Sequence, residues 1–391
     1  MKKATRQQSK KHNRRLVLRT IYQYGEISRA DIARQTHLTR PTVSGIVTDL
    51  IDAELVVETG QGPSAGGKRP LLLAIAADAN QLISIDLSSR VFRGAVVNLR
   101  GDILTRLEFP TNNQKGTAAL ALTYKLIDAL AAAATAPLLG IGIGTPGLVD
   151  PQQGLIMRAV NMGWQDLLLR ELIEARTGWP VYVANDCHAA ALAEYTFGRQ
   201  TTSKNLVVIK VGVGIAAGIV LDGRSYYGDG FGAGEIGHVV VAEQGELCAC
   251  GNVGCLEKMA GTQTILQKAQ LIAANPTLSD LNVRPDVTWE TIVAALEAKE
   301  PATIELIENT GKYLGVAIAN LIGSLNIRHI VIAGRVTRFG DVLLNAACQE
   351  TQRRVLPTMA AQTVISLSAL GDDIVILGGT AMVLQRELGI I

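Results

Sequence analysis

The chain has 391 residues, which is too long for one small domain and suits two or three. Hydrophobic residues make up 48% of it and charged residues 18%, the balance of a packed globular protein. No apolar run approaches the roughly 20 residues that cross a bilayer, and no apolar stretch of signal-peptide type follows the basic N-terminus. We therefore exclude a membrane-spanning or secreted class and expect a soluble, cytoplasmic protein without a membrane partner.

The net charge of +2 is unevenly distributed along the chain. Residues 1–70 carry 13 Lys or Arg and 6 Asp or Glu, a net charge of +7, and the remainder carries −5. The first 19 residues hold eight basic side chains and no acidic one. A basic front on a slightly acidic body indicates a nucleic-acid partner, although residues 1–12 alone fit a solvated tail equally well.

A helix-turn-helix is predicted within the first 51 residues. Apolar positions at helical spacing indicate a first helix over residues 13–24. Ser28 is the expected N-cap of a second helix that runs to about residue 36, with Asp31 completing a capping box. Thr39 caps a third helix, and Pro41 lies in its first turn, where a missing N–H costs nothing. The stripe of the third helix expected to be buried consists of Val43, Ile46, Val47, Leu50 and Ile51.

A β-hairpin of wing type is predicted directly after the third helix. Strands at 55–58 and 71–75 flank a glycine-rich turn, residues 60–67, which is followed by two cations. An interdomain linker is the alternative interpretation, since Gly, Ser and Pro are linker residues. The helix pair, the wing and the positive charge favour DNA binding over a protein-docking module. The residues expected to contact DNA are Arg40, Thr42, Ser44, Lys68 and Arg69.

The rest of the chain contains a weak internal repeat. Each copy reads as a strand, a loop, a second strand, a glycine-containing turn and a third strand, followed later by helices and further buried strands. The expected strands are 82–86, 91–98, 103–109, 139–144 and 181–184 in the first copy, and 206–211, 215–221, 225–227, 330–333 and 374–377 in the second. Two αβ lobes, each with a mixed sheet, imply a cleft in which a small molecule binds.

A cluster of metal-ligating residue types lies in the second copy. His238, Cys248, Cys250 and Cys255 form the Cys₃His set of a closed, tetrahedral structural zinc site. Glycines between the cysteines let the backbone fold tightly enough for the sulfurs to converge. Three buried reduced cysteines are the alternative interpretation, but in a cytoplasmic protein this spacing favours zinc.

Nearly the whole chain resembles the ROK family, which includes bacterial sugar repressors and sugar kinases. The segments that carry this resemblance are Thr145-Pro146-Gly147, Asn185-Asp186, Gly234-Glu235-Ile236-Gly237-His238 and the cysteine cluster ending in Glu257. The helix-turn-helix and two basic segments, Asn13-Arg14-Arg15 and Gly66-Gly67-Lys68-Arg69-Pro70, resemble the repressor branch.

The resemblance implies an α/β fold with an N-terminal winged helix-turn-helix, followed by an actin-like (ribonuclease-H-like) two-lobed sugar-binding domain. The DNA-binding domain with its wing and linker is expected at 1–75 and the sugar-binding domain at 76–391. Lobe one would span about 80–195 plus the C-terminal helix, and lobe two, with the zinc site, about 196–375. Family members assemble as dimers or tetramers, so a homodimer or homotetramer is expected.

The resemblance further implies that Asn185, Asp186, Glu235, His238 and Glu257 bind sugar hydroxyls. Carboxylates accept hydrogen bonds from vicinal hydroxyls, and an amide both donates and accepts. Structural zinc on one ring nitrogen of His238 would fix the tautomer and point the other nitrogen at the sugar. Helix N-capping is the alternative role for Asp186, since residues 187–195 look helical. The expected effector, a monosaccharide or a sugar phosphate, would release the repressor from operator DNA.

A ROK-type sugar kinase carrying a DNA-binding domain is the alternative function. Family kinases hold ATP with loops of Asp-x-Gly-Gly-Thr and Gly-Thr-Gly type and with a Gly-Gly pair. The corresponding segments here are Asp86-Leu87-Ser88-Ser89-Arg90, Gly212-Val213-Gly214 and Gly334-Arg335. Side chains occupy space that backbone N–H groups need to approach phosphate, so we expect no catalytic residues and no enzymatic activity. Arg90 and Arg335 fit either a sugar-phosphate contact or surface salt bridges. A repressor controlled by a partner protein is a third possibility, which an altered set of sugar residues would favour.

Overall fold

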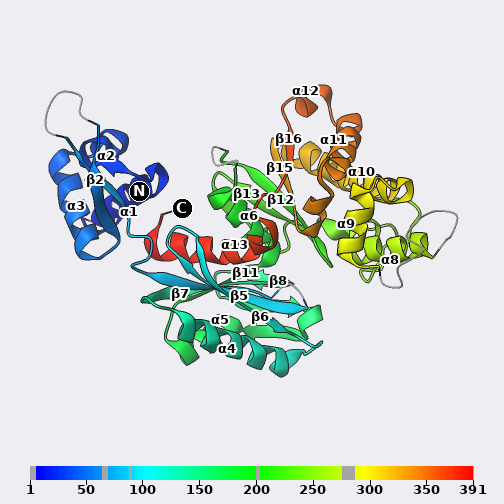
Figure 1. The fold of residues 1–391 in the computed structure, drawn as a ribbon, viewed down its shortest axis with the longest axis horizontal. Helices are drawn as coiled ribbons and strands as arrows, with labels where there is room; N and C mark the ends of the chain where they lie inside the picture. The colour runs from blue at the N-terminus through cyan, green and yellow to red at the C-terminus, as the bar shows by residue number, and fades with distance from the viewer. Residues whose placement is uncertain (1–5, 64–68, 88–89, 200–202, 275–286, 391) are drawn as a thin grey trace. The chain divides into compact units, whose positions relative to one another are not determined.

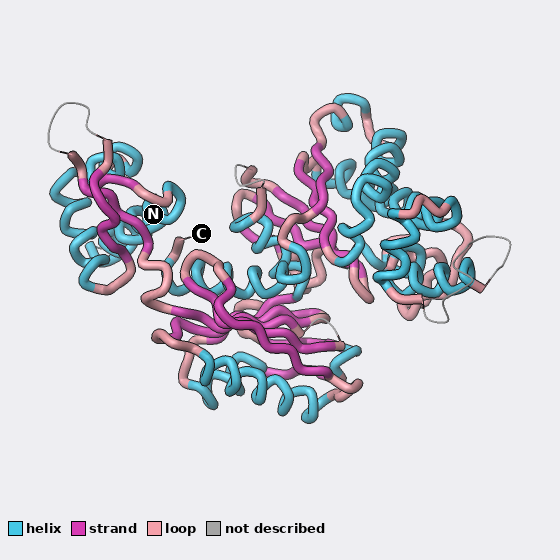
Figure 2. Tube along the Cα trace, in the orientation of Figure 1, coloured by secondary structure: helices cyan, strands magenta, loops and turns pink. Residues whose placement is uncertain are grey.

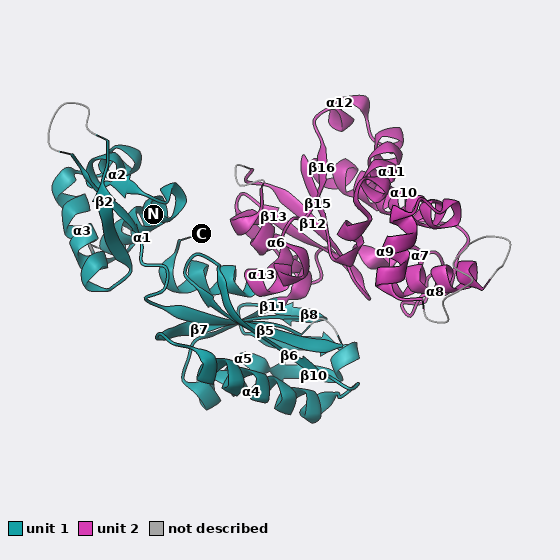
Figure 3. Cartoon of the chain, in the orientation of Figure 1, with its two compact units in different colours: residues 1–184, 379–391 teal, residues 185–378 magenta. Residues whose placement is uncertain are grey.

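The computed structural model describes residues 6–63, 69–87, 90–199, 203–274 and 287–390. The chain divides into two compact units, residues 1–184 with 379–391, and residues 185–378 (Figure 3). Each unit contains both helices and strands (Figure 2), as expected for an α/β protein. The winged helix-turn-helix lies within the first unit, and the expected domain and lobe boundaries stay predictions.

The N-terminal part of the first unit is a winged helix-turn-helix. Its elements, labelled in Figure 1, are α1 (Arg6–Tyr24), β1 (Ile27–Ser28), α2 (Arg29–Thr36), α3 (Arg40–Asp52), β2 (Val56–Gln61) and β3 (Leu71–Ile75). Strand β3 lies between β1 and β2 and is antiparallel to both. Four residues of the predicted stripe on α3 are buried, whereas Ile51 is half-buried.

Both predicted helix caps are present in this domain. The Ser28 hydroxyl accepts a hydrogen bond from the N–H of Asp31, and the Thr39 hydroxyl accepts one from the N–H of Thr42. The Asp31 carboxylate accepts from the Ser28 hydroxyl at 2.6 Å instead of from the backbone N–H expected in a capping box, because Asp is one methylene shorter than Glu.

Two boundaries in this domain differ from the prediction. Helix α1 begins at Arg6, so the basic residues between 6 and 12 belong to a helix, whose residues 7–12 are exposed to solvent. Strand β2 continues to Gln61, because a bulge between Glu58 and Gly60 keeps the strand paired with β3.

The rest of the first unit is built on a five-stranded mixed sheet in the order β11-β7-β4-β5-β6. Its elements are β4 (Gln81–Asp86), β5 (Val91–Asn98), β6 (Ile103–Pro110), α4 (Gly116–Ala133), β7 (Leu138–Thr145), α5 (Leu169–Thr177) and β11 (Val181–Asn185). Figure 1 shows α4 and α5 along one face of the sheet, where both contribute to a single apolar core. A smaller sheet follows β7, made of β8 (Leu148–Asp150), β9 (Leu155–Ala159) and β10 (Trp164–Leu168).

Helix α4 has the length and composition of a membrane-spanning helix. It packs instead on β5 and β6 through Ala119, Leu126, Ile127 and Leu130, all fully buried. It is therefore a core helix of the first unit.

The second unit repeats this sheet pattern in the order β14-β13-β12-β15-β16. Its strands are β12 (Leu206–Val211), β13 (Ile215–Leu221), β14 (Arg224–Tyr226), β15 (His329–Ala333) and β16 (Val364–Leu367). Its helices include α6 (Asp186–Phe197), η2 (Ile236–His238), α7 (Leu256–Ala260), α8 (Thr262–Ala273), α9 (Trp289–Glu297), α10 (Pro301–Leu325), η4 (Arg335–Phe339), α11 (Gly340–Arg354) and α12 (Pro357–Ala360). Helix α6 packs on β12 and β13. Side chains of β12 alternate between the α6 face and a larger core beneath α7, α8 and α10.

The predicted strand at 374–377 is wrong. These residues begin α13 (Ile374–Val383), and the outer strand that pairs with β15 in the second sheet is β16. An apolar run of four residues does not distinguish a buried strand from a buried helix. A Cβ on Gly142 of β7 would lie 2.1 Å from the carbonyl oxygen of Gly379. The glycines that follow the apolar run thus allow a close helix-to-strand contact and do not mark the end of a strand.

Candidate DNA-binding, sugar-binding and metal sites

The first turns of α3 present a polar surface that suits a DNA groove. Arg40 and Ser44 are exposed, while the opposite side of the helix is buried. Thr42 is half-buried, and its hydroxyl lies 2.8 Å from that of Thr39, so this predicted DNA contact also takes part in the helix cap. His37, in the left-handed conformation at φ 56°, makes the tight turn between α2 and α3.

The base of the wing is fixed to the helix pair. Arg29 of α2 forms an ion pair with Glu58 of β2, with an N–O distance of 3.0 Å. The N–H of Gly62 donates to the carbonyl of Pro70 at 2.8 Å, which continues the strand pairing outward. Arg69 is exposed beside this pair. Lys68, the other predicted cation of the wing, lies outside the described residues.

The cysteine motif brings four ligand atoms to one place. One ring nitrogen of His238 and the sulfurs of Cys248, Cys250 and Cys255 all lie within 4.8 Å of one another. The Sγ of Cys248 is 3.6 Å from Nδ1 of His238, and the Sγ of Cys250 is 3.5 Å from that of Cys255. Ligand atoms of a tetrahedral zinc site lie about 3.5–3.8 Å apart, given the usual Zn–S and Zn–N bond lengths. The donor set therefore fits a structural zinc ion.

The backbone of the motif explains why the ligands converge. Gly254 has φ +75°, and a Cβ there would lie 1.9 Å from the carbonyl oxygen of Ala242. The N–H of Cys248 donates to the carbonyl of Asn252 at 2.8 Å, which closes a tight loop around Cys250. Cys250 is exposed, which counts against the alternative of three buried thiols.

The two neighbouring thiols differ in acidity. A backbone hydrogen bond from Asn252 lowers the pKa of Cys250 to about 7. Burial raises the pKa of Cys255 to about 12. The thiolate is the form that binds metal, and Cys250 reaches that form at a lower pH than Cys255.

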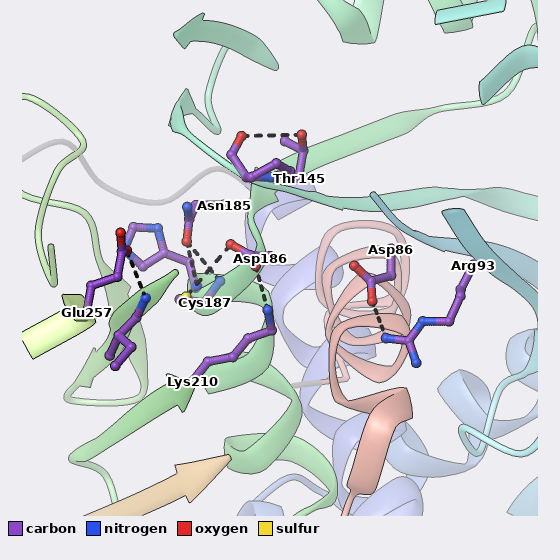
Figure 4. A network of polar contacts seen from close by, with 11 residues as sticks. Asp86, Arg93, Thr145, Asn185, Asp186, Cys187, Lys210 and Glu257 are labelled. Atoms are coloured by element: carbon purple, nitrogen blue, oxygen red, sulfur yellow. Dashed lines mark hydrogen bonds and ion pairs between the residues drawn. The ribbon is translucent and has the colours of Figure 1, made fainter. Parts of the chain in front are cut away.

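Asn185 and Asp186 stand at the junction of β11 and α6. The side-chain oxygen of Asn185 accepts from the N–H groups of Cys187 at 2.8 Å and His188 at 3.4 Å, so Asn185 is the N-cap. The alternative role of Asp186 as the N-cap is therefore wrong, because Asp186 is the first helical residue. Its carboxylate is directed instead toward the ammonium of Lys210 (Figure 4).

The remaining predicted sugar contacts lie in the same unit. The Oε2 of Glu257, in the first turn of α7, accepts from the N–H of Ile215 at 3.3 Å. Burial raises the pKa of Glu235, His238 opposes this, and the like charges of Asp186 and Glu257 add to it. His238, Asp186 and Glu257 therefore each act electrostatically on Glu235, and Asn185 is adjacent to Asp186 in the chain.

Lys210 contacts one of the predicted sugar-binding residues, and the sequence analysis missed it. Its Nζ donates to Oδ2 of Asp186 at 2.7 Å, and both side chains are largely buried. The sequence did contain a signal, because Lys210 is the one charged residue in the apolar run Leu206–Val211. A charge inside such a run needs a partner.

The segments that correspond to kinase phosphate loops carry buried, apolar and charged side chains. Asp86 is fully buried and its carboxylate is paired with Arg93 of the neighbouring strand β5 (Figure 4). Val213 is exposed in the second loop. Arg90 and Arg335 are exposed, and neither forms an ion pair with any residue that the structure describes. Ser88 and Ser89 fall outside the described ranges.

Comparison with known proteins separates the winged helix-turn-helix from the rest of the chain. The model of the ROK family matches residues 82–386, and that of the MarR family matches residues 11–59. The chain is 32% identical over 390 residues to the xylose repressor of Caldicellulosiruptor bescii, with 97% of each covered. It is 34% identical over 316 residues to a glucokinase of Halalkalibacterium halodurans, covering 78% of this chain and 95% of that one.

A solved structure is similar over almost the whole length. It is a ROK family transcriptional regulator, described as a homolog of the Escherichia coli MLC protein, with a TM-score of 0.84, 30% identity and 98% of each chain covered. This similarity and the two family matches confirm the predicted architecture, a winged helix-turn-helix followed by an actin-like domain.

Proposed function

Since the chain belongs to the ROK family and carries a winged helix-turn-helix, we propose that it is a DNA-binding transcriptional repressor of carbohydrate-utilisation genes. A sugar effector releases it from its operator. The observation that carries this proposal is the polar surface of α3, where Arg40 and Ser44 are exposed opposite a buried stripe. A metabolic kinase needs no such helix.

We infer that the effector binds to residues of the second unit. Asn185, Asp186, Glu235, His238 and Glu257 supply the amide, imidazole and carboxylate groups that sugar hydroxyls require. His238 and the three cysteines of the motif would hold zinc, which supplies a rigid structural centre when bound. The imidazole of His238 would then be fixed in one tautomer, with its second nitrogen directed at a hydroxyl.

The mode of DNA recognition follows from symmetry. We propose a homodimer or homotetramer in which two α3 helices read a near-palindromic operator, with half-sites spaced by whole helical turns. Such a protein acts in the cytoplasm, where its operator is. Either a monosaccharide or a sugar phosphate suits the hydroxyl contacts.

A panel of effectors tests the proposal directly. The protein is titrated with xylose, glucose, N-acetylglucosamine and their phosphates, and both thermal unfolding and release of a selected operator duplex are measured. At 100 times its Kd, a bound sugar contributes about 2.7 kcal/mol to stability, which raises Tm by roughly 5–10 °C. Release of DNA is expected in the same concentration range, and failure of every sugar to do either would contradict the proposed function.

A sugar kinase with a DNA-binding appendage is the second candidate, and the similarity to a glucokinase favours it. The burial of Asp86 against Arg93 and the apolar side chain of Val213 count against ATP binding. The same panel is therefore assayed for sugar-dependent ATP consumption. Turnover at an ordinary kinase rate, about 1–100 s⁻¹, would refute a purely regulatory role.

Substitutions in the DNA-binding domain test which residues read the operator. Arg40→Ala is expected to weaken specific binding by about 1–3 kcal/mol if its guanidinium contacts a guanine. Lys68→Ala is expected to weaken binding to all sequences and to reduce the salt dependence, because it removes a phosphate contact. Both effects are measured by fluorescence anisotropy at several salt concentrations.

Arg353→Ala provides the control for loss of one positive charge, since Arg353 is exposed on α11 and paired with Glu350. Operator affinity should not change in this variant. Unchanged affinity in both Arg40→Ala and Lys68→Ala would contradict the assigned DNA contacts.

A further inference from the structure

Lys210 is unusual for its position in the second unit. On β12 it lies on the same face as Leu206 and Val208, which pack in the apolar core shared with α6. The side chain of Lys210 is only 14% exposed, and that of its partner Asp186 only 12%. A cation therefore occupies a position on this face where an apolar side chain would pack without an ionic partner.

Stability does not explain this ion pair. Removing two charges from water has a cost that their mutual attraction often only balances, and apolar residues of similar volume commonly stabilise a core as well or better. A buried ion pair is thus better explained by a need to hold one of its charged groups in a particular orientation.

The ammonium of Lys210 also lies at the group of predicted sugar contacts. Its Nζ would be 3.9 Å from a Cβ on Gly212, and a Cβ on Gly214 would be 3.1 Å from Oε2 of Glu257. Lys210 and Glu257 therefore adjoin the same short loop, residues 212–214. Figure 4 shows the Lys210 side chain reaching the Asp186 carboxylate from β12.

We propose that Lys210 is a positioning residue of the sugar site, an inference that rests on the proposed function. Its ammonium binds Oδ2 of Asp186 and thereby fixes the orientation of the carboxylate. The other oxygen, Oδ1, has the thiol of Cys187 at 3.7 Å, and a thiol is a weaker donor than a sugar hydroxyl. Lys210 thus presents Oδ1 to the sugar without contacting the sugar itself.

A double-mutant cycle distinguishes this role from a structural one. Sugar affinity is measured by calorimetry for Lys210→Met, Asp186→Asn and the combined variant, using whichever of xylose, glucose and N-acetylglucosamine the unsubstituted protein binds most tightly. Lys210→Met is expected to weaken binding about 10-fold or more. Because Lys210 acts through Asp186, the combined variant should bind no more weakly than Asp186→Asn alone.

Two further variants complete the design. Lys210→Arg keeps the cation and should bind the sugar more tightly than Lys210→Met. Arg338→Met removes one cation of an exposed pair with Glu290 in the same unit and should bind as the unsubstituted protein does. If Lys210→Met does not fold, the combined variant, which leaves no charge of the pair behind, still provides the comparison with Asp186→Asn.

The outcomes separate this inference from the proposed function. Two results would overturn the role of Lys210 and leave the proposed function standing. In the first, the losses of sugar affinity multiply in the combined variant. In the second, Lys210→Met binds the sugar as tightly as the unsubstituted protein does. Absence of sugar binding by the unsubstituted protein would overturn the proposed function, and this inference with it.

Discussion

Replacing Cys250 by serine is expected to remove zinc from the protein and to abolish its response to sugar. Cys250 is the exposed member of the cluster, so the substitution removes a ligand with little loss of packing. Structural zinc contributes about 10–16 kcal/mol of binding free energy in small zinc domains, and loss of one thiolate ligand removes a large part of it. Elemental analysis of protein purified without chelator should give one zinc per chain before the substitution and close to none after it.

Cys348→Ser is the matched control, because Cys348 is half-buried on α11 and is not one of the four clustered ligands. It should retain both zinc and the sugar response. A zinc content near zero in the unsubstituted protein, or an unchanged content in Cys250→Ser, would contradict the site.

Asp186→Asn is expected to abolish release of the operator by sugar while sugar-free operator affinity stays the same. The substitution replaces a charged acceptor by a weaker neutral one and leaves the Lys210 ammonium without its carboxylate. Breaking a largely buried pair in this way costs about 3–5 kcal/mol, so thermal unfolding of the variant should occur at a lower temperature. Release is followed by fluorescence anisotropy of a labelled operator, well below that temperature.

Glu290→Gln serves as its control, since it removes one carboxylate from an exposed pair with Arg338. Sugar should release this variant from the operator at the concentration that releases the unsubstituted protein. If that same sugar concentration also releases half of the Asp186→Asn variant from the operator, the carboxylate is not needed for the response.

Features governed by neighbouring residues could be predicted from the sequence. The caps at Ser28 and Thr39 depend on a hydroxyl and an N–H three residues apart, and both are present. Strands β12 and β13 have the predicted bounds, because each is a mainly apolar run ended by a glycine or a turn. The ligands of the metal motif lie within 18 residues of one another, so their convergence could also be expected.

Features that depend on distant parts of the chain could not be predicted. The run beginning at Ile374 became a helix because Gly379 and Gly142, far apart in sequence, allow two backbones to touch. The pairing of Lys210 with Asp186 depends on α6 packing on β12, and no local pattern states which strand a helix will cover. The resemblance to the ROK family likewise implied the carboxylates of the proposed sugar site but not Lys210, the cation that is paired with one of them.

The division of the chain into units has a consequence for its synthesis on the ribosome. The first unit includes the buried residues Ala381, Val383, Leu384 and Leu388, and a Cβ on Gly140 of β7 would lie 3.5 Å from the Val383 side chain. These residues are translated only after the 194 residues from 185 to 378, which takes roughly 10–40 s at bacterial and eukaryotic elongation rates of about 5–20 residues per second. Throughout that interval the glycine face of β7, which includes Gly140 and Gly142, lacks its covering helix in the nascent chain, so the first unit can complete its core only after the second unit has been synthesised.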